Sequence, residues 1–131
     1  MAYDNPIVVT HQFGGVNDFG ADADNVFYFQ GPAGKRGRIL SMMVETREAF
    51  ACTTSAAYVA VGTASDPDAY AKLNIADTTP DNTVFTEADD PDALIAPDLP
   101  ADTAIVVTCG QSVDNSADTG QGVVSIVVAW H

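Results

Sequence analysis

The chain has 131 residues, a length typical of one domain, and 47% of them are hydrophobic, which is too many for a disordered chain. Five basic residues stand against 18 acidic ones, and the net charge of −13 argues against binding to nucleic acids or anionic membranes. No apolar run approaches the roughly 20 residues of a membrane span. Residues 1–10 lack the basic start and apolar stretch of a signal peptide.

Short apolar bursts bounded by Gly, Pro, Asp and Asn recur along the chain, and this pattern predicts β-strands. The expected strands are 6–10, 25–30, 36–47, 56–61, 73–76, 83–86, 103–109 and 123–130. The last of these is apolar on both faces, as a central strand of a sandwich is. Since the chain lacks helical periodicity, we expect an all-β fold with little or no helix.

Turn residues predict the segments between these strands. The Gly- and Asp-rich stretches 13–25 and 114–122 are expected to be loops, and 87–100, with its three prolines, is expected to be irregular and exposed. Ser65 or Asp66, ahead of Pro67, predicts a single helical turn through Tyr70. The whole chain, 1–131, is therefore expected to be one antiparallel, jelly-roll-like β-sandwich domain of about eight strands. Residues 1–24 are expected to form an N-terminal strand or arm and a loop, packed on this sandwich or extending from it.

The expected strand 36–47 carries both apolar and basic residues. Its apolar face is expected to hold Leu40, Met42 and Val44, alternating with Ser41, Met43 and Glu45. The same alternation puts Arg36 and Arg38 on one side and Arg47 on the other. With Lys35, these are four of the five basic residues of the chain. They are expected either to pair with acids of this chain or to contact an acidic neighbour, such as loops of another subunit.

The aromatic run Phe27-Tyr28-Phe29 lies in another expected strand. Alternation directs Phe27 and Phe29 to the core and Tyr28 outward. The alternative is a sugar-stacking platform that combines this run with Trp130. Core packing is the interpretation that the alternation favours.

Few residues suggest catalysis or metal binding. His11 and His131 lie near opposite ends of the chain and are expected to be solvent-exposed, although pairing of the terminal strands would bring them together for a metal. The chain offers no evident nucleophile with its base, so no catalytic, cofactor-binding or metal residue is assigned and we expect no enzyme. Three acidic clusters could hold a structural Ca²⁺ ion between loops: 22–24, 66–68 and 89–92. None of them has the residue spacing of a Ca²⁺-binding helix-loop-helix motif. Cys52 and Cys109 are expected to be buried, reduced thiols, with a disulfide as the alternative.

Four stretches of the chain share a family resemblance. They are GPAGKRGRILSMMVETREAF (31–50), AAYVAVGTASDPDAYAKLNI (56–75), ADTAIVVTCG (101–110) and GVVSIVVAWH (122–131), of which 61–73 is the most distinctive. Together they cover 60 of the 131 residues, and on these stretches the chain resembles the small capsid decoration (cement) proteins of tailed phages. What the resemblance implies is a β-sandwich or jelly-roll module that forms a homotrimer on the capsid exterior.

The function implied by this resemblance is structural and non-catalytic. The protein would be made in the host cytoplasm, bind the major capsid protein on the outside of the virion, and stabilise the capsid by bridging capsomers. Its expected subunit or capsid contacts are Lys35, Arg36, Arg38, Arg47 and Trp130, with residues 1–10 as an arm. The alternative is a carbohydrate- or receptor-binding module of a virion fibre or of a secreted lectin-like protein.

Overall fold

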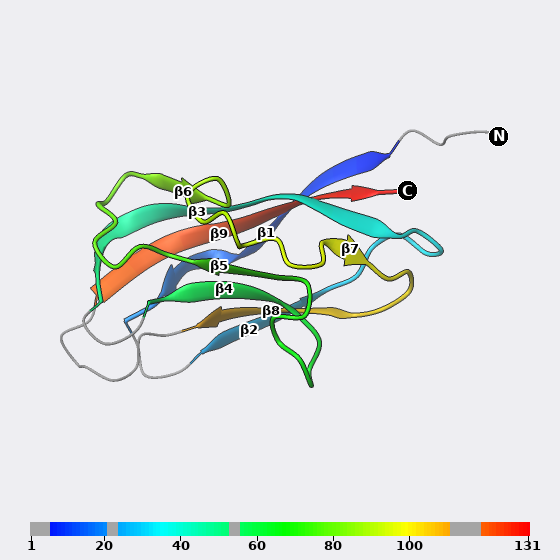
Figure 1. Cartoon of the computed structure of the whole chain (residues 1–131), viewed down its shortest axis with the longest axis horizontal. Coiled ribbons are helices and arrows are strands. Elements are labelled where there is room, and N and C mark those ends of the chain that lie inside the picture. The colour runs from blue at the N-terminus through cyan, green and yellow to red at the C-terminus, as the bar shows by residue number, and fades with distance from the viewer. Residues whose placement is uncertain (1–5, 21–23, 53–55, 111–118) are drawn as a thin grey trace.

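The structure, a computed structural model, describes residues 6–20, 24–52, 56–110 and 119–131. Over these residues the chain forms nine β-strands and no helix (Figure 1). They are β1 (Ile7–Asp18), β2 (Asn25–Phe29), β3 (Gly37–Ala51), β4 (Tyr58–Gly62), β5 (Ala71–Asn74), β6 (Val84–Thr86), β7 (Asp98–Leu99), β8 (Ile105–Gly110) and β9 (Thr119–Trp130). None of the described residues belongs to a helix long and apolar enough to span a membrane.

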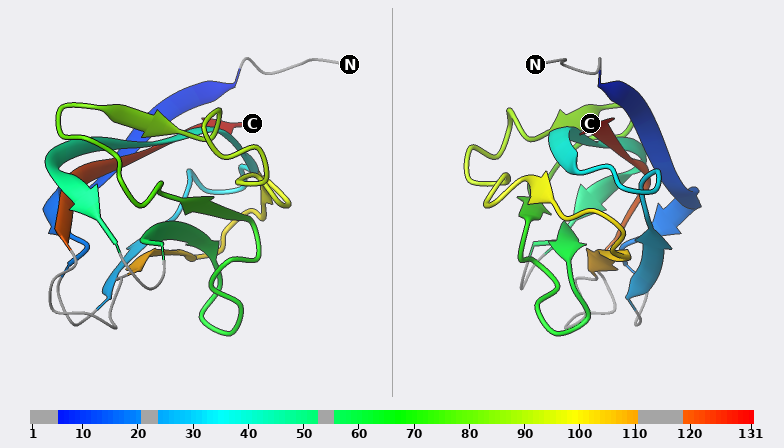
Figure 2. Two further views of the ribbon diagram at one scale, coloured as in Figure 1. Left: turned by 60° about the vertical axis from the view of Figure 1, so that its left-hand side comes forward. Right: turned by 90° about the vertical axis from the view of Figure 1, so that its right-hand side faces the viewer.

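The strands form two antiparallel sheets that face each other (Figures 1 and 2). The five-stranded sheet has the order β1-β9-β3-β6, and β7 pairs with β3 beyond the end of β6; the four-stranded sheet has the order β2-β8-β4-β5. Most successive strands lie in opposite sheets, so the chain winds around the core in a jelly-roll-like order. The prediction of an antiparallel β-sandwich is confirmed, with one more strand than expected, the two-residue β7.

The inner faces of both sheets supply the core. Along β9, every second side chain from Val124 to Trp130 is buried, and those between them are mostly half-buried. This strand pairs with β1 on one side and β3 on the other, as expected of a central strand. The largest fully buried side chains are Trp130, Phe19, Ile39, Met42, Leu73, Ile75, Leu99, Ile105 and Ile126.

A β-bulge changes which face of β3 each residue occupies. The register with β9 shifts between Ile39 and Ser41, so Ile39 and Met42 both point into the core while Leu40 is 46% exposed. The Glu87 carboxylate accepts hydrogen bonds from the Met42 amide and the Ser41 hydroxyl at the bulge, both at 3.1 Å. The expectation that Leu40 lies on the buried face is therefore wrong, because strict alternation cannot pass through an extra residue.

Two expected loops are partly strand. β1 continues through Phe13 to Asp18 with a second register shift, where Gly14 has a φ of 65°. The Asn17 side chain is buried and donates to the Phe13 carbonyl at 3.0 Å, which holds this irregular stretch in the sheet. β9 begins at Thr119, inside the expected loop 114–122, of which residues 114–118 lie outside the described residues.

Two other expectations are corrected by the connecting segments. The single helical turn is absent from residues 63–70, where the Thr63 hydroxyl accepts from the Asp66 amide at 3.0 Å and the Ala69 amide donates to the Asp66 carbonyl at 3.1 Å. These bonds make consecutive turns. Segment 87–100 is irregular, but it is not wholly exposed, because Ala93 and Leu99 are buried.

Candidate functional site

The outer face of the five-stranded sheet is the candidate protein-binding surface. It carries three exposed branched apolar side chains, Val8 of β1, Leu40 of β3 and Val84 of β6, which are 46–56% exposed. The strand register places Val127, Met43 and Val123, all half-buried, on the same face between them. Polar side chains share this face, since the register sets Ser125 beside Met43 and Glu45 between Val123 and Val84. The apolar side chains of the four strands are therefore interspersed with polar ones.

Charges on this face are held in two ion pairs. Arg38 pairs with Asp98 of β7 at 2.8 Å, and Arg47 pairs with Glu45 at 3.3 Å. The bulge in β3 brings both arginines to the same face, so the expectation that Arg47 lies opposite Arg38 is wrong. For these two arginines, pairing within the chain is confirmed. The pairs are exposed and add little stability. Within each pair the two charges cancel, so these four residues add no net charge to this face of a molecule whose net charge is −13.

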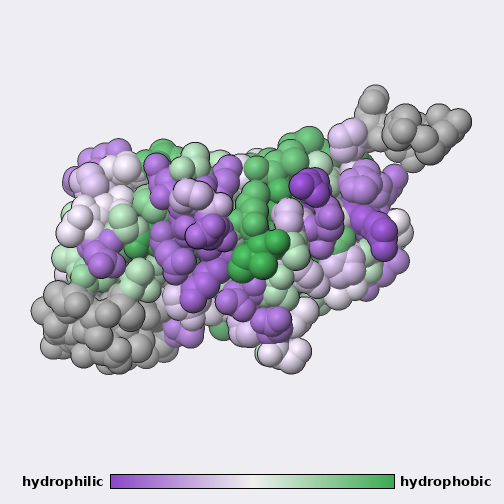
Figure 3. Space-filling model, in the orientation of Figure 1, coloured by the Kyte–Doolittle hydropathy of each residue, from purple (hydrophilic) through white to green (hydrophobic). Residues whose placement is uncertain are grey.

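Apolar surface is also present on the side of the sandwich that carries β6 and β7. Figure 3 shows an apolar band that crosses this side from β3 to the segment between β6 and β7, with hydrophilic residues on both flanks. Ile95 of that segment is 57% exposed. The main-chain amides of Ile95 and Ala96 both donate to the Tyr70 carbonyl, at 3.1 and 2.9 Å, which fixes the segment against the loop before β5.

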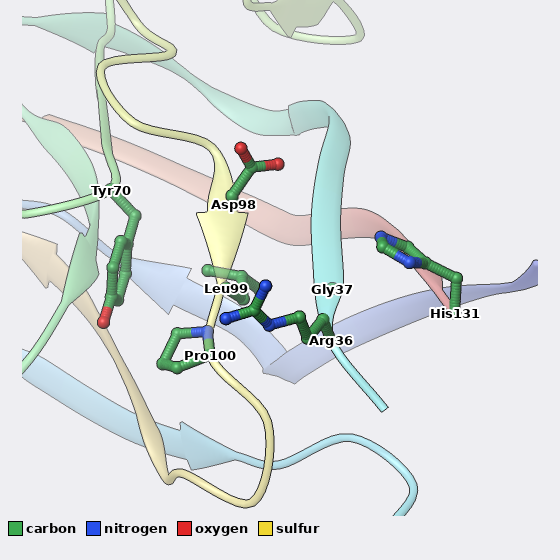
Figure 4. A pocket seen from close by; sticks show the side chains of 7 residues that line it. All are labelled: Arg36, Gly37, Tyr70, Asp98, Leu99, Pro100 and His131. Carbon is green, nitrogen blue, oxygen red and sulfur yellow. The ribbon is translucent and has the colours of Figure 1, made fainter. Parts of the chain in front are cut away.

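The other two basic residues of the predicted contact set lie at one end of the sandwich. Arg36 lines a pocket of about 480 Å³ together with Gly37, Tyr70, Asp98, Leu99, Pro100 and His131 (Figure 4). Its main chain pairs with that of His131 through two hydrogen bonds of 3.0 and 2.8 Å. Lys35 lies in the preceding turn, where its amide donates to the Pro32 carbonyl at 3.0 Å. Whether these residues contact a subunit or a capsid stays a prediction.

Trp130, the fifth predicted contact residue, is buried in the core with 1% of its surface exposed. Its indole NH donates to Nε2 of His11 at 3.2 Å, and His11 lies 4.7 Å from Phe29 between ring centroids. His11 is therefore half-buried, contrary to the expectation that both histidines are exposed, and burial lowers the pKa of its imidazole. β1 and β9 do pair, yet His11 makes its hydrogen bond to Trp130, while His131 lies at the exposed end.

The acidic clusters mostly bind their own backbone. The Asp89 carboxylate accepts from the Thr86 amide and that of Asp90 from the Asn74 amide, both at 2.9 Å. The hydrogen bond that the protonated Asp66 carboxyl donates to the Asp68 carboxylate is the main reason that the pKa of Asp66 is raised. Within the described residues no group of three or more His, Cys, Asp or Glu side chains is placed to hold a metal; of the cluster 22–24, residues 22 and 23 lie outside them.

Cys52 and Cys109 are both buried and neither forms a disulfide, as expected of structural thiols. Burial, followed by the charge of Asp24, raises the pKa of the Cys109 thiol to about 12. A thiol with so high a pKa stays protonated near neutral pH and is a poor nucleophile.

The outer face of the four-stranded sheet is covered in part by the chain itself, while Val26 of β2 is 47% exposed on it. The Tyr58 ring lies over Gly110, where an added Cβ would come within 2.1 Å of it, and the Lys72 ammonium lies 4.6 Å from the ring centroid. Tyr58 and Lys72 border a hollow of about 200 Å³ whose other lining residues are Ala60, Pro67 and Asp68. Tyr28 is the exposed aromatic on this face, at 68%, while Phe27 and Phe29 pack against the core as predicted.

Comparison with family models, curated proteins and solved structures finds no match to this chain. A β-sandwich by itself hosts many unrelated functions, so function has to be argued from the surfaces. Sequence reasoning identified the basic residues and the apolar character of both sides of 123–130. It missed that β1, β3 and β6 add apolar side chains to the outer face and that Tyr70 and Leu99 contribute to the pocket. The signal for the face was present in 123–130, whose apolar residues occupy both sides of the strand.

Proposed function

We propose that this protein is a non-catalytic capsid decoration protein that binds the exterior of a phage capsid as a homotrimer and bridges its capsomers. The observation that carries the proposal is the outer face of the five-stranded sheet, which carries exposed or half-buried apolar side chains on four strands and two ion-paired arginines. The resemblance of the sequence to tailed-phage decoration proteins supplies the kind of partner.

The chemistry of this face suits contact with protein. Protein interfaces have an apolar centre and a polar rim. Val127 and Met43 lie at the centre of the face, and the pair Arg38–Asp98 lies toward one edge. A second copy of the chain can approach there with little repulsion, whereas most other surfaces of a protein with 18 acids and five bases repel a copy of themselves. The acidic remainder of the surface keeps decorated particles dispersed.

Apolar contact also suits a clamp between capsomers. Burial of apolar surface is not screened by salt, so the bond resists separation of capsomers over a wide range of ionic strength. A stable interface buries about 800 Å² on each partner. The proposal therefore needs most of the outer face to be covered in the assembled particle.

Light scattering of the purified protein tests the oligomer. The expected mass is three times the 13.7 kDa of one chain, and it should persist on dilution. Val127→Glu puts a charge in the centre of the face and should yield monomers. The matched control, Tyr28→Glu, adds the same charge to an exposed position of the other sheet and should leave the trimer intact.

Sedimentation with capsids of the encoding phage tests the partner. Wild type and Tyr28→Glu should sediment with expanded capsids and raise the temperature at which these open, while Val127→Glu should stay in solution. A folded wild-type protein that neither forms trimers nor sediments with capsids overturns the proposal.

The carbohydrate- or receptor-binding alternative has one observation in its favour. Tyr28 is exposed on the outer face of the four-stranded sheet, on the same face as the hollow beside Tyr58. Stacking on the Tyr58 ring is opposed by Gly110 beneath it and by the Lys72 ammonium over it. A glycan array that gives signal with wild type and none with Tyr28→Ala would favour this function over the capsid proposal.

A further inference from the structure

The pocket at the end of the sandwich is lined by one permanent cation, Arg36, by Asp98 and His131, and by the apolar residues Leu99 and Pro100 with the Tyr70 ring. Gly37 lines it with main-chain atoms, because a Cβ there would come within 2.7 Å of the buried Trp130 ring on the core side. The side chain of Leu99 is buried beneath it, and Pro100 and Tyr70 form the wall opposite Arg36 (Figure 4). Its volume of about 480 Å³ lies in the range of sites for small organic ligands.

Arg36 differs from the other cations of the described chain in its pairing. Arg38 and Arg47 form ion pairs, and Lys72 lies over the Tyr58 ring. Lys35 also has an interaction partner. Arg36, in contrast, makes no side-chain hydrogen bond or ion pair with any residue that the structure describes. An unpaired guanidinium is unexpected on a protein with 18 acidic residues.

The direction of the side chains makes this guanidinium a ligand-binding group. Figure 4 shows it extending over Leu99 toward Pro100 and the Tyr70 ring, while the Asp98 carboxylate is directed away from it. Asp98 is engaged by Arg38 at 2.8 Å, so the acid on the rim of the pocket does not offset the charge of Arg36. A planar guanidinium binds a carboxylate through two parallel hydrogen bonds.

We propose that this pocket binds a carboxylate carried on a compact apolar body, with Arg36 holding the carboxylate and Leu99, Pro100 and the Tyr70 ring holding the body. The ligand is either a free aryl or alkyl carboxylate or the C-terminal residue of a peptide, since both present this chemistry. The inference does not depend on the capsid proposal, because the pocket lies at the end of the sandwich and not on the outer face of the five-stranded sheet.

Titration of the full chain with 3-phenylpropionate and with its neutral amide tests the charge requirement. Trp130 is the only tryptophan of the chain and packs on Gly37 of the pocket, so its fluorescence reports on binding, with amide shifts of Gly37 and Leu99 by NMR as the second measurement. We expect saturable binding of the acid and at least about tenfold weaker binding of the amide, because loss of a charge-assisted hydrogen bond costs about that much.

Variants assign the binding to Arg36. Arg36→Gln should weaken binding of the acid about tenfold or more, and Arg36→Lys should lie between it and wild type, because an ammonium lacks the planar fork. Arg47→Gln removes the same charge at the far end of β3 and should bind like wild type. Arg36 is exposed, so both of its variants should keep the wild-type melting temperature.

Two peptides that end in Phe, one with a free and one with an amidated C-terminus, distinguish the two sources of the carboxylate. Binding of the free-terminus peptide at least as tight as that of 3-phenylpropionate assigns the site to polypeptide chain ends, and binding of phenylpropionate alone assigns it to small carboxylates. If neither acid binds, or if acid and amide bind equally to wild type and Arg36→Gln, the inference is overturned.

Discussion

The outer faces of the two sheets are covered in different ways. On the four-stranded sheet, Gly62 and Gly110 leave room for the chain's own atoms, and the 63–70 loop and the Tyr58 ring occupy that room. On the five-stranded sheet, Val8 and Val84 stand exposed at positions where a self-contained protein needs no apolar side chain. The comparison teaches that small residues let the chain's own atoms cover part of a face, whereas branched apolar side chains stay exposed on both outer faces, Val26 of β2 at 47% included.

The largest expected effect on stability is a difference between alanine substitutions at two neighbouring residues of β3. Ile39→Ala should lower the free energy of unfolding by about 2–5 kcal/mol, because Ile39 is 1% exposed. Leu40→Ala should change it by no more than about 0.5 kcal/mol, as for a surface position. Urea unfolding of both variants in the Val127→Glu background, which is expected to be monomeric, measures both. A greater loss for Leu40→Ala would mean that the bulge is absent and that the outer face is not apolar at this point.

A glycine substitution tests how the four-stranded sheet is covered. Gly62→Ala places a Cβ 2.2 Å from the Asp66 carbonyl oxygen, and since backbone cannot swing aside, the 63–70 loop must move. We expect a loss of about 1–3 kcal/mol, read from the melting temperature. The control is Gly15→Ala, whose Cβ meets nothing within 4 Å and should change stability by less than about 0.5 kcal/mol. Equal losses in both variants would contradict the close approach at Gly62.

His11 connects the two sheets, and its protonation should weaken that connection. Burial lowers its pKa in the folded state below 6.5, and its neutral Nε2 accepts the Trp130 indole hydrogen bond. Between the folded-state pKa and 6.5 the unfolded chain binds the proton more tightly, so the contribution of His11 to stability is complete above this window and falls as the pH drops through it.

The pH effect is measured as a difference between variants. Many carboxylates also titrate in acid, so the informative quantity is the melting temperature of wild type minus that of His11→Gln, which keeps a hydrogen-bond acceptor. This difference should shrink from about pH 7 to about pH 5.5. A difference that stays constant or grows on acidification would show that the folded-state pKa of His11 is not lowered.

The smallest expected effect concerns the ion pairs of the outer face. Arg47→Gln breaks a pair whose side chains are about half exposed, so we expect a loss of no more than about 1 kcal/mol, reduced further by salt. Urea unfolding at low and high salt measures it. A loss of several kcal/mol that persists in high salt would mean that Arg47 stabilises the fold by more than an exposed ion pair with Glu45.

Much of the fold was predictable because its signals are local. Alternation placed Phe27 and Phe29 inward and Tyr28 outward, and the apolar run 123–130 identified the central strand. The errors occur where the backbone departs from regular pairing. The Leu40 bulge moved Arg47 to the face of Arg38, and Gly14, with its positive φ, lies within a strand that reads as a loop.

The binding surfaces were less predictable than the fold. The four cations are visible in the sequence, but which of them pairs with an acid depends on contacts such as Arg38 with Asp98, sixty residues away along the chain. The pocket of Arg36 needs Tyr70, from the loop before β5, and Leu99, from β7. No spacing in the sequence brings these three residues together.

By itself, the sequence determined the all-β class, the acidic surface and the inward direction of most apolar side chains, because strand propensity, charge and period-two alternation act between near neighbours. Only the tertiary structure decided which side chains share a face, which arginine remains unpaired among the described residues and where a pocket opens. These depend on strand register, bulges and long-range packing, since a one-residue shift in register exchanges the two faces of a strand.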